Sequence, residues 1–199
     1  MVHISKRNVA VVLFALCLQP KPAFSGSPTE QIEQTVSQVL SVVNTPPAGG
    51  EETRKKSLRE TIMPRFDWPE MARQTLGKHW DGLSARQNEF VSAFAEFLSN
   101  AYVGKIASYR DEKILYLRET VDKDRAQVNT KIVPSKGDPT SVNYQLHRVQ
   151  DEWKIYDVVV EDVSLVMNYR SQFNRILTKG SFDDLFRQLR DKDSMAYKQ

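Results

Sequence analysis

The side chains able to do chemistry are few in this sequence and lie far apart. Beyond residue 25 the only histidines are His79 and His147, which form no H-x-x-x-H pair and have no cysteine beside them. A metal site needs three or four converging ligands, so this spacing disfavours metal binding. The sequence also lacks the G-x-S-x-G, P-loop and G-x-G-x-x-G patterns on which serine-hydrolase and nucleotide chemistry depend.

Asp157 is the one acidic residue within the apolar run 153–160. A carboxylate beside an apolar pocket is one way to build a general base, with Tyr109 or Tyr169 as a partner in proton transfer. We favour a structural role. With a two-residue turn before this run, Arg148 lies diagonal to Asp157 on the same face of a hairpin, within reach of an ion pair.

An aromatic stripe is the most prominent apolar feature. It follows helical spacing through Phe90, Phe94, Phe97, Leu98, Ala101, Tyr102, Ile106 and Tyr109. A long helix over a sheet needs such a stripe for its core, which is the simplest interpretation. The same residue types also line apolar cavities, so hydrophobicity alone leaves both interpretations open.

The composition is that of a chain able to bury a core. Hydrophobic residues make up 40% and charged residues 27% of the 199, which is typical of a globular protein. Lys6, Arg7 and Lys21 account for the whole formal charge of +3, and the remaining 25 basic and 25 acidic residues balance. A neutral chain has no overall attraction for nucleic acid, so we expect no such partner.

Residues 1–25 are typical of a secretory signal peptide. A short basic stretch precedes the apolar run 9–18, which is too short for a bilayer core about 30 Å thick, and residues 23–25 offer a cleavage site. Cys17 leaves a lipoprotein signal as the alternative, although Leu16 is not the small residue that usually precedes a lipidated cysteine. Cys17 is the only cysteine, so the mature chain has no disulfide. In a Gram-negative host we expect a soluble periplasmic protein.

Start and stop signals position the helices that flank the middle of the chain. Residues 27–30 predict a capping box at the first helix, and Asp67 with Glu70 predicts a second one before a helix that ends at Gly77. Further helices are predicted over 51–63, over about 25 residues from Ser84, from Ser164 to Gly180, and from Ser181 onward.

Between these helices the pattern switches to period two. Four strands are predicted over residues 113–121, 125–133, 140–149 and 153–160. Their short connections require antiparallel neighbours, so they form a four-stranded meander. A two-residue first turn would place Leu115 and Leu117 on one face with Val128, Thr130 and Ile132. We therefore expect an α+β fold, with one domain over 26–190, helices covering one face of the sheet, and a frayed tail over 191–199.

Several segments taken together resemble a known family. In chain order they are Phe66-Asp67, Leu76-Gly-Lys-His-Trp80, Leu83-Ser-Ala-Arg-Gln87, Phe94, Tyr102, Trp153-Lys-Ile-Tyr-Asp-Val158 and Ser164-Leu-Val-Met-Asn-Tyr-Arg-Ser-Gln-Phe173. Their order and spacing, behind a signal peptide, resemble the MlaC or toluene-tolerance (Ttg2-type) family of periplasmic phospholipid-binding transport proteins. The resemblance covers about residues 30–190.

The resemblance implies a carrier rather than an enzyme, with no cofactor and a bound phospholipid as cargo. The acyl tails would lie in an apolar cavity between sheet and helices. Such a carrier shuttles lipid between an outer-membrane lipoprotein complex and an inner-membrane ABC transporter complex with a membrane-anchored substrate-binding subunit, which maintains outer-membrane lipid asymmetry. A ligand-free periplasmic adaptor and a carrier of a hopanoid-type lipid are the alternatives.

Eleven residues are expected to line the cavity. Six occupy positions that match the family, namely Phe94, Tyr102, Trp153, Val158, Tyr169 and Phe173. Helix or strand phase alone supports the other five, namely Ile106, Tyr144, Leu146, Val160 and Val166. Trp153 could equally belong to a closed core.

One turn departs from the family pattern. Where the family usually has Glu-Gly-x-Ser, this chain has Glu161-Asp162-Val163-Ser164. Aspartate tolerates a positive φ better than most residues, so we expect the turn to form. The departure indicates a divergent branch of the family, so a hopanoid-type lipid remains an alternative cargo.

Overall fold

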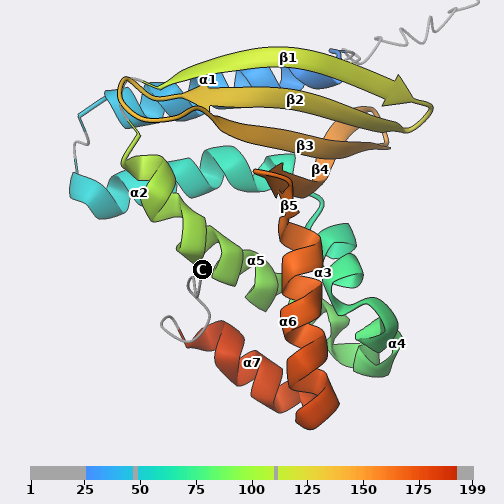
Figure 1. The fold of residues 1–199 in the computed structure, drawn as a ribbon. Coiled ribbons are helices and arrows are strands. Elements are labelled where there is room, and N and C mark those ends of the chain that lie inside the picture. Colours follow the sequence, from blue (N-terminus) through green and yellow to red (C-terminus); the bar gives the residue numbers. More distant parts are fainter. Residues whose placement is uncertain (1–25, 47–48, 110–111, 192–199) are drawn as a thin grey trace, which may run out of the picture.

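In the part of the chain that the structure describes, helices come first, followed by a sheet and then by further helices (Figure 1). The structure is a computed structural model that describes residues 26–46, 49–109 and 112–191. The expected signal peptide lies outside these residues, as does the expected tail beyond Asp191. The helices are α1 (Pro28–Asn44), α2 (Gly50–Ile62), α3 (Trp68–Leu76), α4 (Trp80–Leu83), α5 (Gln87–Ala107), α6 (Leu165–Lys179) and α7 (Phe182–Arg190), with short 3-10 turns η1 (Met63–Arg65), η2 (Gly77–His79) and η3 (Ser84–Arg86).

The sheet is an antiparallel meander in the order β1-β2-β3-β4-β5. Its strands are β1 (Lys113–Asp122), β2 (Arg125–Val133), β3 (Thr140–Val149), β4 (Glu152–Val160) and β5 (Val163–Ser164). The α+β prediction is therefore confirmed, and β5 is a short addition that the sequence pattern did not predict. The helices gather on one side of the sheet (Figure 1). Among them, α1 packs closely on β1 and β2, whereas α3 and α6 pack on β4.

The inner face of the sheet is apolar because alternate residues of three strands come into line there. Val128 of β2 stands opposite Tyr144 of β3, which stands opposite Val158 of β4. Ile32 of α1 joins the same buried cluster. Because side chains alternate between the two faces of a strand, the sheet has one apolar face, and the helices cover it.

The predicted face of Leu115 and Leu117 is wrong. The first turn has two residues as assumed, since Asp122 pairs with Arg125, but a β-bulge at Leu117 shifts the register. Leu115 therefore pairs with Lys131 rather than Ile132, and both leucines are about half exposed, at 47% and 56%. An extra residue in one strand reverses the facing of everything beyond it, and the sequence gives no local sign of it.

One of the two predicted capping boxes forms and the other does not. At α1 the predicted capping box forms, because the Ser27 amide donates to the Glu30 carboxylate at 2.8 Å and the Glu30 amide donates to the Ser27 hydroxyl. At α3, Asp67 accepts from the Glu70 amide at 2.9 Å, but the box does not close. The Asp67 amide instead donates to the Ile155 carbonyl of β4 at 2.8 Å, so it is no longer available to Glu70.

Helices α3, α5, α6 and α7 share an aromatic core. Phe90 and Phe94 of α5 meet Phe173 of α6 edge-on, with ring centroids 5.9 and 5.8 Å apart. The long helix is shorter than expected, since α5 has 21 residues and Ser84–Arg86 form a 3-10 turn before it. Within the described part of the chain, no helix is both long and apolar enough to cross a bilayer.

Candidate functional site

The expected cavity residues fall into three neighbouring hydrophobic clusters rather than one wall. Phe94, Val166, Tyr169 and Phe173 belong to the aromatic core of the helices, with Tyr102 partly buried beside it. Phe94 and Phe173 have no exposed surface. Because these rings contact one another edge-on at 5.8 to 6.0 Å, the structure places them in closely packed protein.

The second group lies on the inner face of the sheet. Leu146, Trp153 and Val158 are buried there, whereas Tyr144 and Val160 are only partly buried. The backbone amide of Trp153 donates to the Gln31 side chain of α1 at 3.2 Å, which fixes the start of β4 against that helix. The Trp153 side chain is thus part of the cluster that joins the sheet to α1.

Ile106 belongs to the third cluster, which α1, α2 and α5 build around Val43, Leu58 and Val103. It is partly buried, as is Tyr109 just beyond the end of α5. Tyr109 also lies close enough to a tyrosine of β3 to raise the pKa of that phenol.

That tyrosine is Tyr144, which stands near Tyr116 of β1 as well as Tyr109. Burial raises the pKa of the Tyr144 phenol above its ordinary range, and the two neighbouring phenols raise it further. Burial, followed by the negative charge of Glu33, raises the pKa of Tyr116 to about 12. Three partly buried phenols from β1, β3 and the end of α5 therefore meet in a poorly hydrated region.

Asp157 caps a helix, and the predicted ion pair with Arg148 is wrong. Its carboxylate accepts hydrogen bonds from the Val158 amide at 2.8 Å, the Ser164 hydroxyl at 2.5 Å and the Val166 amide at 3.0 Å. The two-residue turn before β4 is at residues 150–151, so Arg148 pairs with Trp153 and its diagonal neighbour is Ile155. A register shift between Gln145 and Leu146 then places Asp157 on the other face of the hairpin. Arg148 pairs with Asp151 instead, at 3.7 Å.

In the described residues, the side chains of His79 and His147 each make one hydrogen bond to a neighbouring element. His147 of β3 contacts the Asp67 carboxylate at 2.8 Å, so one residue both caps α3 and ties it to the sheet. His79 lies 3.0 Å from the Asn174 side chain of α6. In the described residues, no group of three or more His, Cys, Asp or Glu side chains converges as metal ligands would.

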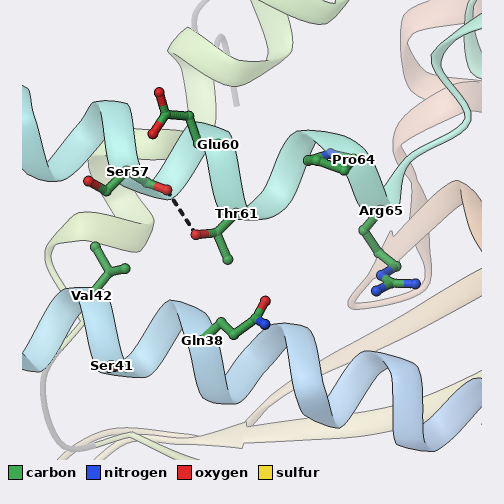
Figure 2. A pocket seen from close by; sticks show the side chains of 8 residues that line it. All are labelled: Gln38, Ser41, Val42, Ser57, Glu60, Thr61, Pro64 and Arg65. Atoms are coloured by element: carbon green, nitrogen blue, oxygen red, sulfur yellow. Dashed lines mark hydrogen bonds between the residues drawn. The ribbon is translucent and has the colours of Figure 1, made fainter.

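A polar groove between α1 and α2 is the feature that sequence patterns missed. Its volume is about 610 Å³, and Figure 2 shows its lining, which comes from α1, α2 and the turn η1 that follows α2. The lining residues are Gln38, Ser41, Val42, Ser57, Glu60, Thr61, Pro64 and Arg65. The sequence feature that could have indicated the groove is an uncharged polar face of α1. It consists of residues at helical spacing, namely Gln31, Gln34, Thr35, Gln38 and Ser41.

Arg65 stands where this groove meets a second, smaller hollow of about 210 Å³. Its Nε donates to the Thr35 hydroxyl at 3.0 Å, and its Nη1 donates to the Gln31 side chain at 2.7 Å. Burial lowers the pKa of Arg65, an effect that the negative charge of Glu152 partly opposes. The guanidinium is thus a half-buried cation held by neutral groups.

Comparison with known proteins gives consistent results. The family described as MlaC protein matches residues 33–191. A Haemophilus influenzae protein, described as the intermembrane phospholipid transport system binding protein MlaC, is 24% identical over 143 residues, covering 69% of this chain and 67% of that protein. The structure of a phospholipid-binding protein from Ralstonia solanacearum, solved in complex with a phospholipid, has a TM-score of 0.77 at 21% identity, covering 86% of this chain and 99% of that one.

Proposed function

Because the chain belongs to the MlaC protein family, we propose that it is a phospholipid carrier that encloses the acyl tails of its cargo between sheet and helices. Membership confirms the prediction of a binding and transport protein rather than an enzyme. The single observation that carries the proposal is the fold that this chain shares with the Ralstonia protein, which was solved with a phospholipid bound.

The inner face of the sheet supports this location for the tails. Tyr144, Val160 and Tyr116 point to that face and keep accessible surface, although the helices cover it. The Tyr144 phenol is nevertheless desolvated enough for its pKa to rise. A desolvated phenol on this face fits an apolar binding region from which the tails would exclude water.

The eleven expected residues then take different parts in the proposed site. Tyr144, Val160 and Ile106, which are partly accessible, would contact the tails directly, together with Tyr102. The remaining seven are buried. Leu146, Trp153 and Val158 would form the wall behind the tails on the inner face of the sheet. The other four, Phe94, Val166, Tyr169 and Phe173, would support the site from the packed core of the helices.

Apolar burial is sufficient to hold such a cargo. Each methylene removed from water contributes about 0.8 kcal/mol, so a pair of long tails binds strongly without any covalent or ionic contact. Release then requires a state of the protein with a lower affinity, which a partner must stabilise.

The compartment and partners follow from the same proposal. The predicted signal peptide would place the carrier in the periplasm. The Haemophilus relative is described as a component of an intermembrane transport system, which supports an exchange of lipid between an outer-membrane lipoprotein complex and an inner-membrane ABC transporter complex. The membrane-anchored subunit of the inner complex would be the partner that receives or delivers the lipid.

Lipid loading in a pair of matched variants tests the location of the tails. Val160→Trp would fill space on the inner face, whereas Val159→Trp adds the same bulk to the opposite face of β4, one residue away. Both valines are partly buried. After incubation with phosphatidylglycerol vesicles, we expect Val160→Trp to acquire several-fold less lipid phosphate than the wild type and Val159→Trp to acquire the normal amount.

Circular dichroism and thermal unfolding of both variants separate a filled cavity from a misfolded chain. Equal loading of two folded variants would contradict the proposed location. A wild type that acquires no lipid under any condition would overturn the carrier function and favour the adaptor.

A further inference from the structure

We propose that the groove between α1 and α2 binds the phosphate group of a phosphorylated glycerol, with Arg65 as its cationic centre. The ligand chemistry is shared by a free phosphate ester and by the head group of a phospholipid. The head-group version rests on the proposed carrier function, whereas the site itself does not.

The hydrogen bonding of Arg65 leaves part of its guanidinium available. An arginine has five N–H donors in a planar fork. Nε is used by Thr35, and Nη1 is used by Gln31 and, at 3.5 Å, by the Trp153 carbonyl. In the described parts of the chain, Nη2 has no protein acceptor. Two N–H groups on one nitrogen are therefore free, at a residue that lines both hollows.

Glu152 lines the smaller hollow and its negative charge acts on Arg65, but neither it nor Glu60 forms an ion pair with this residue. Glu152 forms its ion pair with Lys154, whose ammonium also donates to the Pro64 carbonyl at 2.9 Å. Glu60 lies 3.9 Å from Lys56, and its carboxylate points away from α1 (Figure 2). Within the described residues, no carboxylate comes within ion-pair distance of the Arg65 guanidinium. The cation is oriented but unpaired, which is the state that an oxyanion would complete.

The rest of the lining provides neutral hydrogen-bonding groups. Gln38, Ser41 and Ser57 line the groove, and the side chains of these three make no hydrogen bond to any other described residue. Thr61 is already used, since its hydroxyl donates to the Ser57 carbonyl at 2.9 Å, as the dashed line in Figure 2 shows. One guanidinium with hydroxyl and amide groups is a common way to recognise phosphate oxygens.

Size and position favour a phosphate ester over a bare ion. A groove of about 610 Å³ holds considerably more than one phosphate group. Val42 lines the groove and also packs against the cluster that contains Ile106 and Tyr109. Arg65 lies at the other end of the groove from Val42 (Figure 2), but its Nη1 donates to the carbonyl of Trp153, whose side chain belongs to the cluster on the inner face of the sheet. A phosphate at Arg65 would thus lie beside the cluster that borders the proposed tail region, as the head group of a bound phospholipid requires.

Titration with glycerol 3-phosphate and with inorganic phosphate, by isothermal calorimetry at low ionic strength, tests the site itself. We expect Arg65→Gln to weaken binding of the glycerol phosphate about ten-fold or more, the loss typical of a charge-assisted hydrogen bond. Arg175→Gln is the control, because it removes an exposed arginine of α6 far from the groove.

A second variant keeps the test valid if Arg65→Gln unfolds. Gln38→Glu leaves the Arg65 contacts in place and adds a negative charge at an exposed position of the groove, so we expect a similar loss of affinity. If the wild type shows no saturable phosphate binding at millimolar concentrations, or if both variants bind as the wild type does, the site is refuted.

Loading from phosphatidylglycerol vesicles distinguishes the two sources of the phosphate. A fall in lipid loading in both groove variants, parallel to the loss of glycerol phosphate binding, assigns the site to the head group. Normal loading with lost glycerol phosphate binding assigns it to free phosphate esters. A wild type that binds glycerol phosphate but takes up no lipid would overturn the carrier function and leave the groove site intact.

Discussion

At the scale of one residue, Asp157 is a buried carboxylate that caps α6. It is 8% exposed, and its three hydrogen bonds include the amide of Val166 in the first turn of α6. We expect Asp157→Ala to lower the free energy of unfolding by about 2–3 kcal/mol, because the helix loses a charged cap and buried donors lose their acceptor. Urea denaturation monitored by circular dichroism measures this.

Arg148→Ala is the control, since this side chain is half exposed and pairs with Asp151 at 3.7 Å. Its effect should stay below about 0.5 kcal/mol. An equal cost for the two substitutions would mean that Asp157 pairs with Arg148 after all, as residue spacing alone predicted.

The tyrosines of the inner face predict a pH dependence at the alkaline end. The pKa of Tyr116 is raised to about 12, and that of Tyr144 is also raised, by burial. In the unfolded chain both phenols ionise near pH 10, so the unfolded state loses protons first and is favoured. The free energy of unfolding should therefore fall as pH rises from about 10 towards 12.

Urea denaturation of the wild type and of a Tyr116→Phe, Tyr144→Phe double variant at pH 9 and pH 11 measures this effect. The double variant should lose less stability between the two values than the wild type. The same loss in both proteins would show that these phenols are not desolvated.

At the scale of elements, the turn between β4 and β5 has two successive residues with positive φ. Glu161 and Asp162 both have positive φ, at 46° and 63°, so two residues with side chains occupy a conformation that glycine adopts without cost. The turn forms as expected, and Asp162 has the positive φ that aspartate tolerates better than most residues. Asp162→Gly should raise the free energy of unfolding by about 0.5–1 kcal/mol, and Asp162→Ala should lower it. Thermal and urea unfolding would contradict this if the two variants changed stability in the same direction.

The elements also show where prediction from sequence succeeds. Helix starts at Ser27 and Ser181 were predictable because caps depend on residues three apart. Strand bounds followed from alternation, and β2 and β3 have the predicted ends. The register shifts at Leu117 and near Leu146 were not predictable, because a bulge is stabilised by the partner strand and not by its own residues.

At the scale of the whole molecule, one part of the candidate site could be predicted from the sequence and another part could not. The inner face of the sheet was predictable from strand phase, since Tyr144, Val158 and Val160 do share it. The sequence could not predict that the aromatic stripe of α5 belongs to a closed core, because cavity and core use the same residue types. The groove at Arg65 depends on the pairing of α1 with α2, which neither helix encodes alone.

Native mass spectrometry tests the carrier function most directly. Residues 26–199 would be purified from a bacterial periplasm, followed by solvent extraction and lipid analysis. We expect a stoichiometric adduct with the mass of a phospholipid, and an extract that identifies its tails and head group. An adduct with the mass of a polycyclic lipid would show that the cargo is a hopanoid-type lipid and not a phospholipid. A bare polypeptide, still empty after incubation with vesicles, would contradict the carrier function.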